Sequence, residues 1–384
     1  MVPHGRRVPA GPTTRVISFL AVAVALSLAV PPGAAGARAA GVTQRRAEIV
    51  RAVAVTTGLN GPSAFTFGPN GRIWYLERGT GRVQVLDPST DRERTFFRIS
   101  HVDGQGERGA LGIALHPRYP RKPFVYAYAT RTQSGRLWNQ LLRIRADGGR
   151  GVGFKVLFRS PVGAATNHNG GRILIGPDRK LWVVDGDNAN PANAQDRSNN
   201  LMGKMLRVEL DGSIPATNPL GSRIWSYGHR NSYGFAFDPF TESLWQTENG
   251  PSCNDEINLI VRGGNFAWGP NSRCSSPPTV QDTNRDGPLP RLLPERRFAS
   301  PIGITGAAFC DRCGLGGRQH GALLFGAVND QRIRALRLNE ARTAFAGSVR
   351  ILGTGPTRIH SMEVGPGGRI YISGSTGIYR LVRA

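Results

Sequence analysis

A hairpin pattern recurs six times along this chain, and this repeat limits the fold more than any other feature. Each copy has a short apolar strand, a turn of the Gly-Pro-Asn/Asp-Gly type or a close variant, and a second strand that opens with basic and aromatic residues. The copies cover residues 64–77, 113–130, 172–187, 236–250, 307–330 and 362–375. A further alternating strand follows each hairpin, at residues 81–86, 140–146, 203–210, 255–261, 331–338 and 377–382.

Six such units predict a closed ring. A repeat of about 57 residues suits one four-stranded blade, and a single blade cannot bury both faces of its sheet alone. A β-sandwich is the structural rival, but it does not need one hairpin repeated six times. We therefore expect an all-β, six-bladed β-propeller of four-stranded antiparallel blades, with residues 41–384 as one domain. Its functional site should lie where the inner strands converge.

Residues 1–40 have a different character. Three arginines precede the apolar run 16–30, and two prolines and a stretch of small residues follow it. This order is typical of a secretory signal peptide, with cleavage expected near residues 37–40. The apolar run is short for a membrane span of about 20 residues, although an uncleaved anchor stays open. We therefore predict a secreted or periplasmic protein with no membrane span after cleavage.

The charge balance is strongly basic. The chain has 49 Lys and Arg against 26 Asp and Glu, a formal charge of +23, and loss of the four leader arginines leaves about +19. Nearly all of these cations are arginines, scattered along the chain and not clustered with aromatic residues into a stripe. We therefore predict no nucleic-acid partner.

Four cysteines in an exported chain indicate disulfide bonds. We expect one bond between Cys253 and Cys274 and a local one between Cys310 and Cys313. A four-thiolate zinc site is the alternative, but only one pair has finger-like spacing. A redox-active Cys-x-x-Cys is also disfavoured, because no strand-helix-strand pattern surrounds it.

Two polar strings precede the third and fourth hairpins, where a plain blade would not need them. The string 167–172 contains His168, and an imidazole at the start of an inner strand could accept a hydroxyl proton near neutral pH. The string 227–231 contains Arg230 and Asn231, which could hold an anionic or quinonoid oxygen. The structural alternatives are a histidine that hydrogen bonds the next blade and an arginine that closes a salt bridge between blades.

A third string, residues 248–268, combines carboxylates with turn carbonyls. Calcium prefers such oxygen ligands, although the spacing is not that of an EF-hand. A capped polar turn is the alternative interpretation.

Together these strings resemble the family of pyrroloquinoline-quinone-dependent glucose/sorbosone dehydrogenases, and they resemble its compact aldose sugar dehydrogenase branch more closely than the longer soluble glucose dehydrogenases. The resemblance runs from about residue 53 to 382 and includes residues 109–117, 205–215 and 250–268.

The resemblance implies a role for each matching residue. His168 would be the general base, Arg230 and Asn231 would contact the quinone, and Arg230 would also act in catalysis. Arg358 matches the first of two cofactor-binding arginines. The implied calcium ligands are the carbonyls of Gly250 and Pro251 for one ion, and Glu256, the Phe266 carbonyl and the adjacent Asp255 for a second.

The chain departs from the family pattern at four positions. Asn167 replaces an acidic residue, and Glu107 stands near an expected substrate-binding Gln, so a preference for glucose does not carry over. Asn329 stands where a Lys is usual and His360 where a second Arg is usual. Losing two cations weakens the hold on a cofactor with three carboxylates, unless Arg332 or Arg334 compensates.

The resemblance implies an exported quinoprotein that oxidises aldose sugars at the anomeric carbon to aldonolactones. It would use pyrroloquinoline quinone and calcium and pass electrons to an external acceptor. The alternative is a propeller without cofactor that binds a glycan or a cell-surface polymer, which the basic charge would suit. Other calcium-dependent propeller enzymes, such as lactonases, also remain open.

Overall fold

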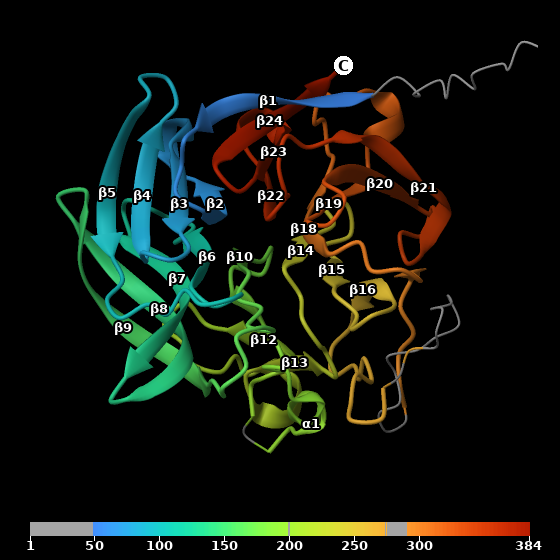
Figure 1. Cartoon of the computed structure of the whole chain (residues 1–384), viewed down its shortest axis with the longest axis horizontal. Helices are drawn as coiled ribbons and strands as arrows, with labels where there is room; N and C mark the ends of the chain where they lie inside the picture. Colours follow the sequence, from blue (N-terminus) through green and yellow to red (C-terminus); the bar gives the residue numbers. More distant parts are fainter. Residues whose placement is uncertain (1–48, 199, 273, 275–289) are drawn as a thin grey trace, which may run out of the picture. The chain divides into compact units, whose positions relative to one another are not determined.

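The computed structural model describes residues 49–198, 200–272, 274 and 290–384, so the predicted leader lies outside the described residues. The described chain folds into six four-stranded antiparallel sheets arranged as a β-propeller, which confirms the predicted fold (Figure 1). The inner strands β2, β6, β10, β14, β18 and β22 surround the centre of the ring.

Each blade runs outward from its inner strand. Blade 1 holds β2 (Pro62–Phe67), β3 (Ile73–Glu77), β4 (Arg82–Asp87) and β5 (Arg92–Arg98). Blade 2 holds β6 (Ala110–Leu115), β7 (Phe124–Gln133), β8 (Arg136–Asp147) and β9 (Arg150–Pro161). Blade 3 holds β10 (Ile173–Ile175), β11 (Leu181–Asp185), β12 (Lys204–Val208) and β13 (Ile224–Tyr227).

Blades 4 to 6 follow the same order. Blade 4 holds β14 (Gly234–Phe237), β15 (Leu244–Glu248), β16 (Asp255–Ile260) and β17 (Arg296–Phe298). Blade 5 holds β18 (Ile304–Phe309), β19 (Leu323–Ala327), β20 (Arg332–Leu338) and β21 (Phe345–Thr354). Blade 6 holds β22 (Ser361–Val364), β23 (Ile370–Ser373), β24 (Gly377–Arg383) and β1 (Val50–Thr57).

The six predicted hairpins and the strand after each are therefore confirmed. The outer strand of each blade was not located from the sequence, and in blade 6 this strand, β1, comes from the opposite end of the chain and pairs antiparallel with β24. Figure 1 shows the blue β1 alongside the red β24. This pairing closes the ring.

Helices are few. The described residues include the short α1 (Pro191–Gln195), whose first turn is capped by the Asn190 side chain, and four one-turn 3₁₀ segments. These segments are η1 (Pro69–Gly71), η2 (Pro219–Gly221), η3 (Gly317–Gln319) and η4 (Pro366–Gly368). No helix in the described part of the chain is long and apolar enough to cross a membrane.

The hydrophobic core lies between neighbouring blades. Six clusters of buried side chains each combine two adjacent blades, as the alternating strands require when both faces of a sheet are covered. Pairs that share a cluster are Leu76 and Ala127, Tyr128 and Leu206, Met205 and Phe235, Trp245 and Phe325, Leu324 and Ile372, and Ile378 and Phe65.

Glycines allow the inner strands to approach closely near the ring axis. A Cβ on Gly112 would lie 2.1 Å from the Gly171 oxygen, and one on Gly306 would lie 2.2 Å from the Met362 nitrogen. Because these neighbours are backbone atoms that cannot swing away, glycine is required at both positions.

Both predicted disulfides are confirmed. Cys253 is bonded to Cys274, and Cys310 is bonded to Cys313. The four cysteines are therefore not available as thiolate ligands for zinc.

Candidate active site

A cavity of about 730 Å³ lies at one end of the ring, where the inner strands begin. All six blades line it, through residues at or just before the start of each inner strand. One such residue from each blade is Ser63, Leu111, Arg172, Tyr233, Thr305 and His360. The cavity is therefore the place where side chains far apart in sequence meet.

His168 lies in this cavity and is almost completely buried. Its backbone adopts a left-handed conformation, with φ of 59°, which turns the chain sharply before β10. Its Nδ1 lies 2.7 Å from the Asp187 Oδ1. Because a carboxylate accepts, Nδ1 carries the proton and Nε2 keeps its lone pair.

Asp187 is a functional residue that sequence reasoning missed. It is completely buried, and besides His168 it accepts hydrogen bonds from the Ala189 backbone N–H at 2.9 Å and from the Trp268 Nε1–H at 2.6 Å. These donors fix the carboxylate and therefore the imidazole ring. The available signal was the Asp-Gly-Asp string, residues 185–187, which begins at the last residue of the buried strand β11.

Arg230 also lines the cavity, and its position is held by blade 4. Its Nη1 donates to the carbonyls of Asn249 at 2.9 Å and Gly250 at 2.8 Å, and its backbone N–H donates to the Glu248 Oε1 at 2.7 Å. The other Glu248 oxygen contacts the His229 Nδ1 at 2.9 Å. Burial lowers the pKa of Arg230 from its usual value, while nearby carboxylates oppose this shift.

Glu107 connects three blades at the cavity wall. Its Oε2 accepts from the backbone N–H of His168 at 2.6 Å and from the Asn231 Nδ2 at 3.1 Å. The Tyr233 hydroxyl also hydrogen bonds this carboxylate, and burial, followed by the Glu107 charge, raises the Tyr233 pKa well above its usual value. Glu107 therefore fixes the backbone of the proposed base relative to Asn231.

Arg358, Asn329 and His360 also line the cavity. The Arg358 side chain makes no hydrogen bond or ion pair within the described part of the chain, so its charge is available to a ligand. The Asn329 Nδ2 donates to the Pro301 carbonyl at 3.3 Å. Burial, and then the charges of nearby arginines, lower the pKa of His360 to about 4, so it is neutral at pH 7 and does not replace a cation.

Arg332 and Arg334 do not supply the missing charge. Both form ion pairs with the Asp330 carboxylate. The Arg332 Nε lies 3.9 Å from it, and Arg334 makes a close bidentate pair. Neither arginine lines the cavity. Arg78 and Arg172 also line the cavity, besides Arg230 and Arg358, and the sequence pattern had not indicated a role for either.

The predicted calcium ligands fall into two groups. Gly250, Pro251 and Asp255 line the cavity, whereas Glu256 and Phe266 are buried outside it. Both Asp255 oxygens accept backbone N–H groups, Oδ1 from residue 250 at 3.0 Å and Oδ2 from residues 302–304 at 2.7–3.2 Å. No group of three or more His, Cys, Asp or Glu side chains in the described ranges is arranged to hold a metal.

Comparison with known proteins shows which family this chain is similar to. The family model described as glucose/sorbosone dehydrogenase matches residues 59–383. The chain is 34% identical to quinoprotein glucose dehydrogenase B of Acinetobacter calcoaceticus, over 56% of this chain and 51% of that protein. It is 27% identical to the aldose sugar dehydrogenase YliI of Escherichia coli, over 82% of this chain and 87% of that protein.

A solved structure of a sugar dehydrogenase is also similar to this chain. The PQQ-bound form of an aldose sugar dehydrogenase from Streptomyces coelicolor superposes with a TM-score of 0.73 at 27% identity, over 87% of this chain and 97% of that one. The chain spans about half the length of the Acinetobacter protein and most of the length of the other two.

Proposed function

This chain belongs to the glucose/sorbosone dehydrogenase family, and from that premise we propose that it is a quinoprotein sugar dehydrogenase. It would oxidise aldoses at the anomeric carbon to aldonolactones, using pyrroloquinoline quinone and calcium, and pass the electrons to an external acceptor. The observation that carries this proposal is the buried His168–Asp187 pair beside Arg230 in one cavity. We also keep the prediction that residues 1–40 export the protein to the periplasm or the medium.

The charges in the cavity fit a polyanionic cofactor. Four arginines line it, against two carboxylates, and Asp255 already uses both oxygens on backbone amides. Pyrroloquinoline quinone carries three carboxylates, which arginine binds well. Arg358, with no protein partner among the described residues, and Arg230 are the cations that we assign to it, together with the Asn231 amide.

The main-chain carbonyls of Gly250 and Pro251 would hold the first calcium ion, since calcium prefers oxygen ligands. The Gly250 oxygen also accepts from Arg230 at 2.8 Å, so the guanidinium and the ion would use the same carbonyl. When bound, the quinone would supply the hydride acceptor for the sugar, and calcium would supply the polarising charge.

The chain itself handles the proton. The Nε2 of His168 is the atom left to accept the proton of the anomeric hydroxyl. The Asp187 carboxylate stabilises the positive charge that then forms on the ring, at the 2.7 Å contact with Nδ1. Arg230, half-buried in the wall of the same cavity, places positive charge where negative charge develops during oxidation.

A second, structural calcium ion is proposed at Glu256 and the Phe266 carbonyl. Asp255 would act beside it by holding four backbone amides of blades 4 and 5, as its contacts indicate. Calcium should therefore raise the melting temperature of the protein, and Glu256→Ala should reduce that increase. An equal increase in the variant would remove this assignment.

The second candidate function is a propeller that binds a glycan or acidic polymer without a cofactor. Asn329 and a neutral His360 favour it, because two positions that are usually cationic in the family carry no charge here.

The deciding experiment is titration calorimetry of the protein without its leader with pyrroloquinoline quinone in excess calcium, followed by dye reduction with a panel of aldoses. Stoichiometric binding with turnover supports the dehydrogenase. Absence of binding would contradict it and would direct the search to glycan ligands. His168→Ala is the matched variant, and it should bind the quinone yet lose turnover.

A further inference from the structure

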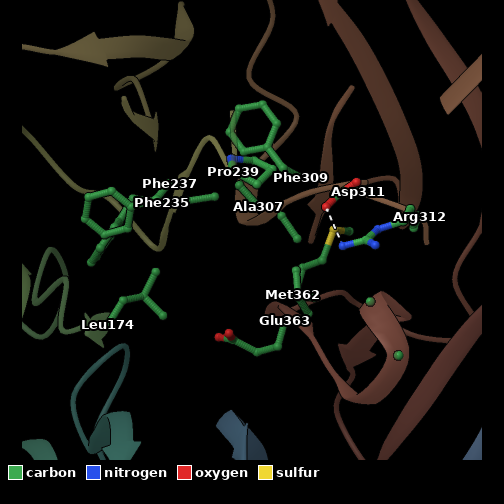
Figure 2. Close-up of a pocket in the computed structure, with 15 residues that line it drawn as sticks. Leu174, Phe235, Phe237, Pro239, Ala307, Phe309, Asp311, Arg312, Met362 and Glu363 are labelled. Carbon is green, nitrogen blue, oxygen red and sulfur yellow. Dashed lines mark ion pairs between the residues drawn. The ribbon is translucent and has the colours of Figure 1, made fainter. Parts of the chain in front are cut away.

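A second cavity of about 610 Å³ lies where the inner strands of blades 3 to 6 end, and it shares no lining residue with the proposed active site. Its wall carries hydrocarbon side chains from four inner strands (Figure 2). They include Leu174 of β10, Phe237 of β14, Phe309 of β18 and Met362 of β22. An apolar wall of this kind favours a ligand with a hydrocarbon body.

One carboxylate lies in this cavity with few partners. Figure 2 shows the Glu363 side chain directed into the open space between Leu174 and Met362, and only 14% of that side chain is exposed. Among the described residues, the Ser361 hydroxyl, 3.5 Å from Oε1, is its only hydrogen-bond donor. A buried carboxylate normally accepts several short hydrogen bonds, so Glu363 has unused acceptor capacity facing the cavity.

The nearest cation does not satisfy this carboxylate. The Arg172 Nη1 lies 3.7 Å from the Glu363 Oε1, beyond ordinary hydrogen-bond distance. The Arg172 N–H groups donate instead to the carbonyls of Tyr233 at 3.2 Å and His360 at 3.3 Å. Burial raises the pKa of Glu363 to about 7, although Arg172 opposes the shift.

A second charged pair lines this cavity, and it does not supply a partner for Glu363. Asp311 and Arg312 lie 3.6 Å apart, and the Arg312 side chain is 87% exposed to solvent (Figure 2). Their opposite charges offset each other, which leaves Glu363 as the other charged side chain in the lining of this cavity.

We propose that this second cavity is a binding site for a small organic cation, a primary amine with a short hydrocarbon body whose ammonium group lies on Glu363. An ammonium offers three N–H donors to a carboxylate that lacks them, and such charge-assisted hydrogen bonds are strong. The hydrocarbon body would cover the side chains of Leu174, Phe237 and Phe309. An anion would be repelled by Glu363, and a sugar would leave its hydroxyl groups without partners against this wall.

The site is tested by titration calorimetry of the protein without its leader at pH 8 with benzylamine as the probe. Benzyl alcohol, of nearly the same shape but without charge, is the control ligand. We expect one benzylamine per chain, at least tenfold tighter than benzyl alcohol. Absence of saturable binding, or equal affinity for the two probes, would overturn the proposal.

Three variants locate the site. Glu363→Gln should weaken benzylamine binding at least tenfold, and Leu174→Trp, which fills the cavity while keeping the carboxylate, should also remove it. Asp91→Asn removes an exposed carboxylate that does not line this cavity, and it should leave the affinity unchanged. The melting temperature of each variant shows whether it is folded, and unaltered binding by folded Glu363→Gln and Leu174→Trp proteins would refute the assignment.

Discussion

His168 depends on a carboxylate that lies 19 positions later in the chain. We expect His168→Ala to lower kcat for aldose oxidation by about 10² to 10⁴, the range for a lost general base. Asp187→Asn should lower kcat by about 10² or more. Asp187 accepts hydrogen bonds from the His168 ring, the Ala189 backbone and the Trp268 ring, and the NH₂ group of an asparagine would face one of these donors with a donor of its own. Steady-state dye reduction by quinone-loaded protein measures both effects. An Asp187→Asn enzyme within twofold of wild type would contradict the positioning role.

The charge of the cavity can be changed at Asn329, which lines it without an acidic partner of its own. Asn329→Lys should bind pyrroloquinoline quinone about tenfold more tightly, since a charge-assisted hydrogen bond contributes about 1.5 kcal/mol or more. Asn329→Gln, similar in length but neutral, is the matched control. Calorimetry gives both constants, and equal affinities would show that position 329 does not face the cofactor.

The raised pKa of Glu363 predicts how the stability of the protein depends on pH. Its folded pKa, about 7, lies above its usual 4.5, so the protonated form is favoured by folding. The wild-type free energy of unfolding should therefore fall as pH rises from about 4.5 to 7, and Glu363→Gln should lack that part of the slope. The two proteins should differ by an amount that changes by about 2–3 kcal/mol across this range. The nearby charged groups Arg172, Asp311 and Arg312 are unchanged in the variant. The free energy of unfolding of both proteins is measured by denaturant titration at each pH, and the same pH dependence in both would contradict this account.

At the scale of strands, the sequence predicts the inner three strands of each blade because their alternation and turns are local. The outer strands were not resolved from the sequence, since β5 and β21 are largely exposed and lack a clean alternation. The partner of β24 was beyond local reasoning, because it lies at the other end of the chain.

Local sequence patterns likewise predicted some residues of the candidate site and missed the contacts between distant segments. His168, Arg230 and Asn231 stand out because polar strings precede inner strands. The contacts that orient them join distant segments, such as Trp268 with Asp187 and Glu107 with His168, and a single sequence does not show such pairs.

Ring closure by β1 gives a prediction at this scale. A chain that begins after Thr57 should lose its cooperative thermal transition, because the edge of β24 loses its pairing strand and the core cluster of blades 5 and 6 loses the buried Val50. A synthetic peptide with the sequence of β1 should restore the transition when added in excess, whereas a peptide with the same residues in scrambled order should not. Cooperative unfolding of the shortened chain without peptide would show that blade 6 is stable with three strands.

The whole ring depends on how closely its inner strands approach the axis. Gly306→Ala should lower the free energy of unfolding by about 2–4 kcal/mol, since the new methyl group would overlap the backbone of Ser361 and Met362. Gly79→Ala, at a position with open space around it, is the control and should change stability by less than about 1 kcal/mol. Equal effects of the two substitutions in denaturant unfolding would indicate that the inner strands can move apart.

The two ends of blade 6 also have a consequence for biosynthesis. A ribosome makes β1 before any other described strand and β24 after all of them, so β1 waits for its partner throughout translation. A chain that stops before Gly377 leaves two open strand edges, one on β1 and one on β23, and such edges recruit other chains or proteases. Only a chain translated through β24 can therefore cover both edges.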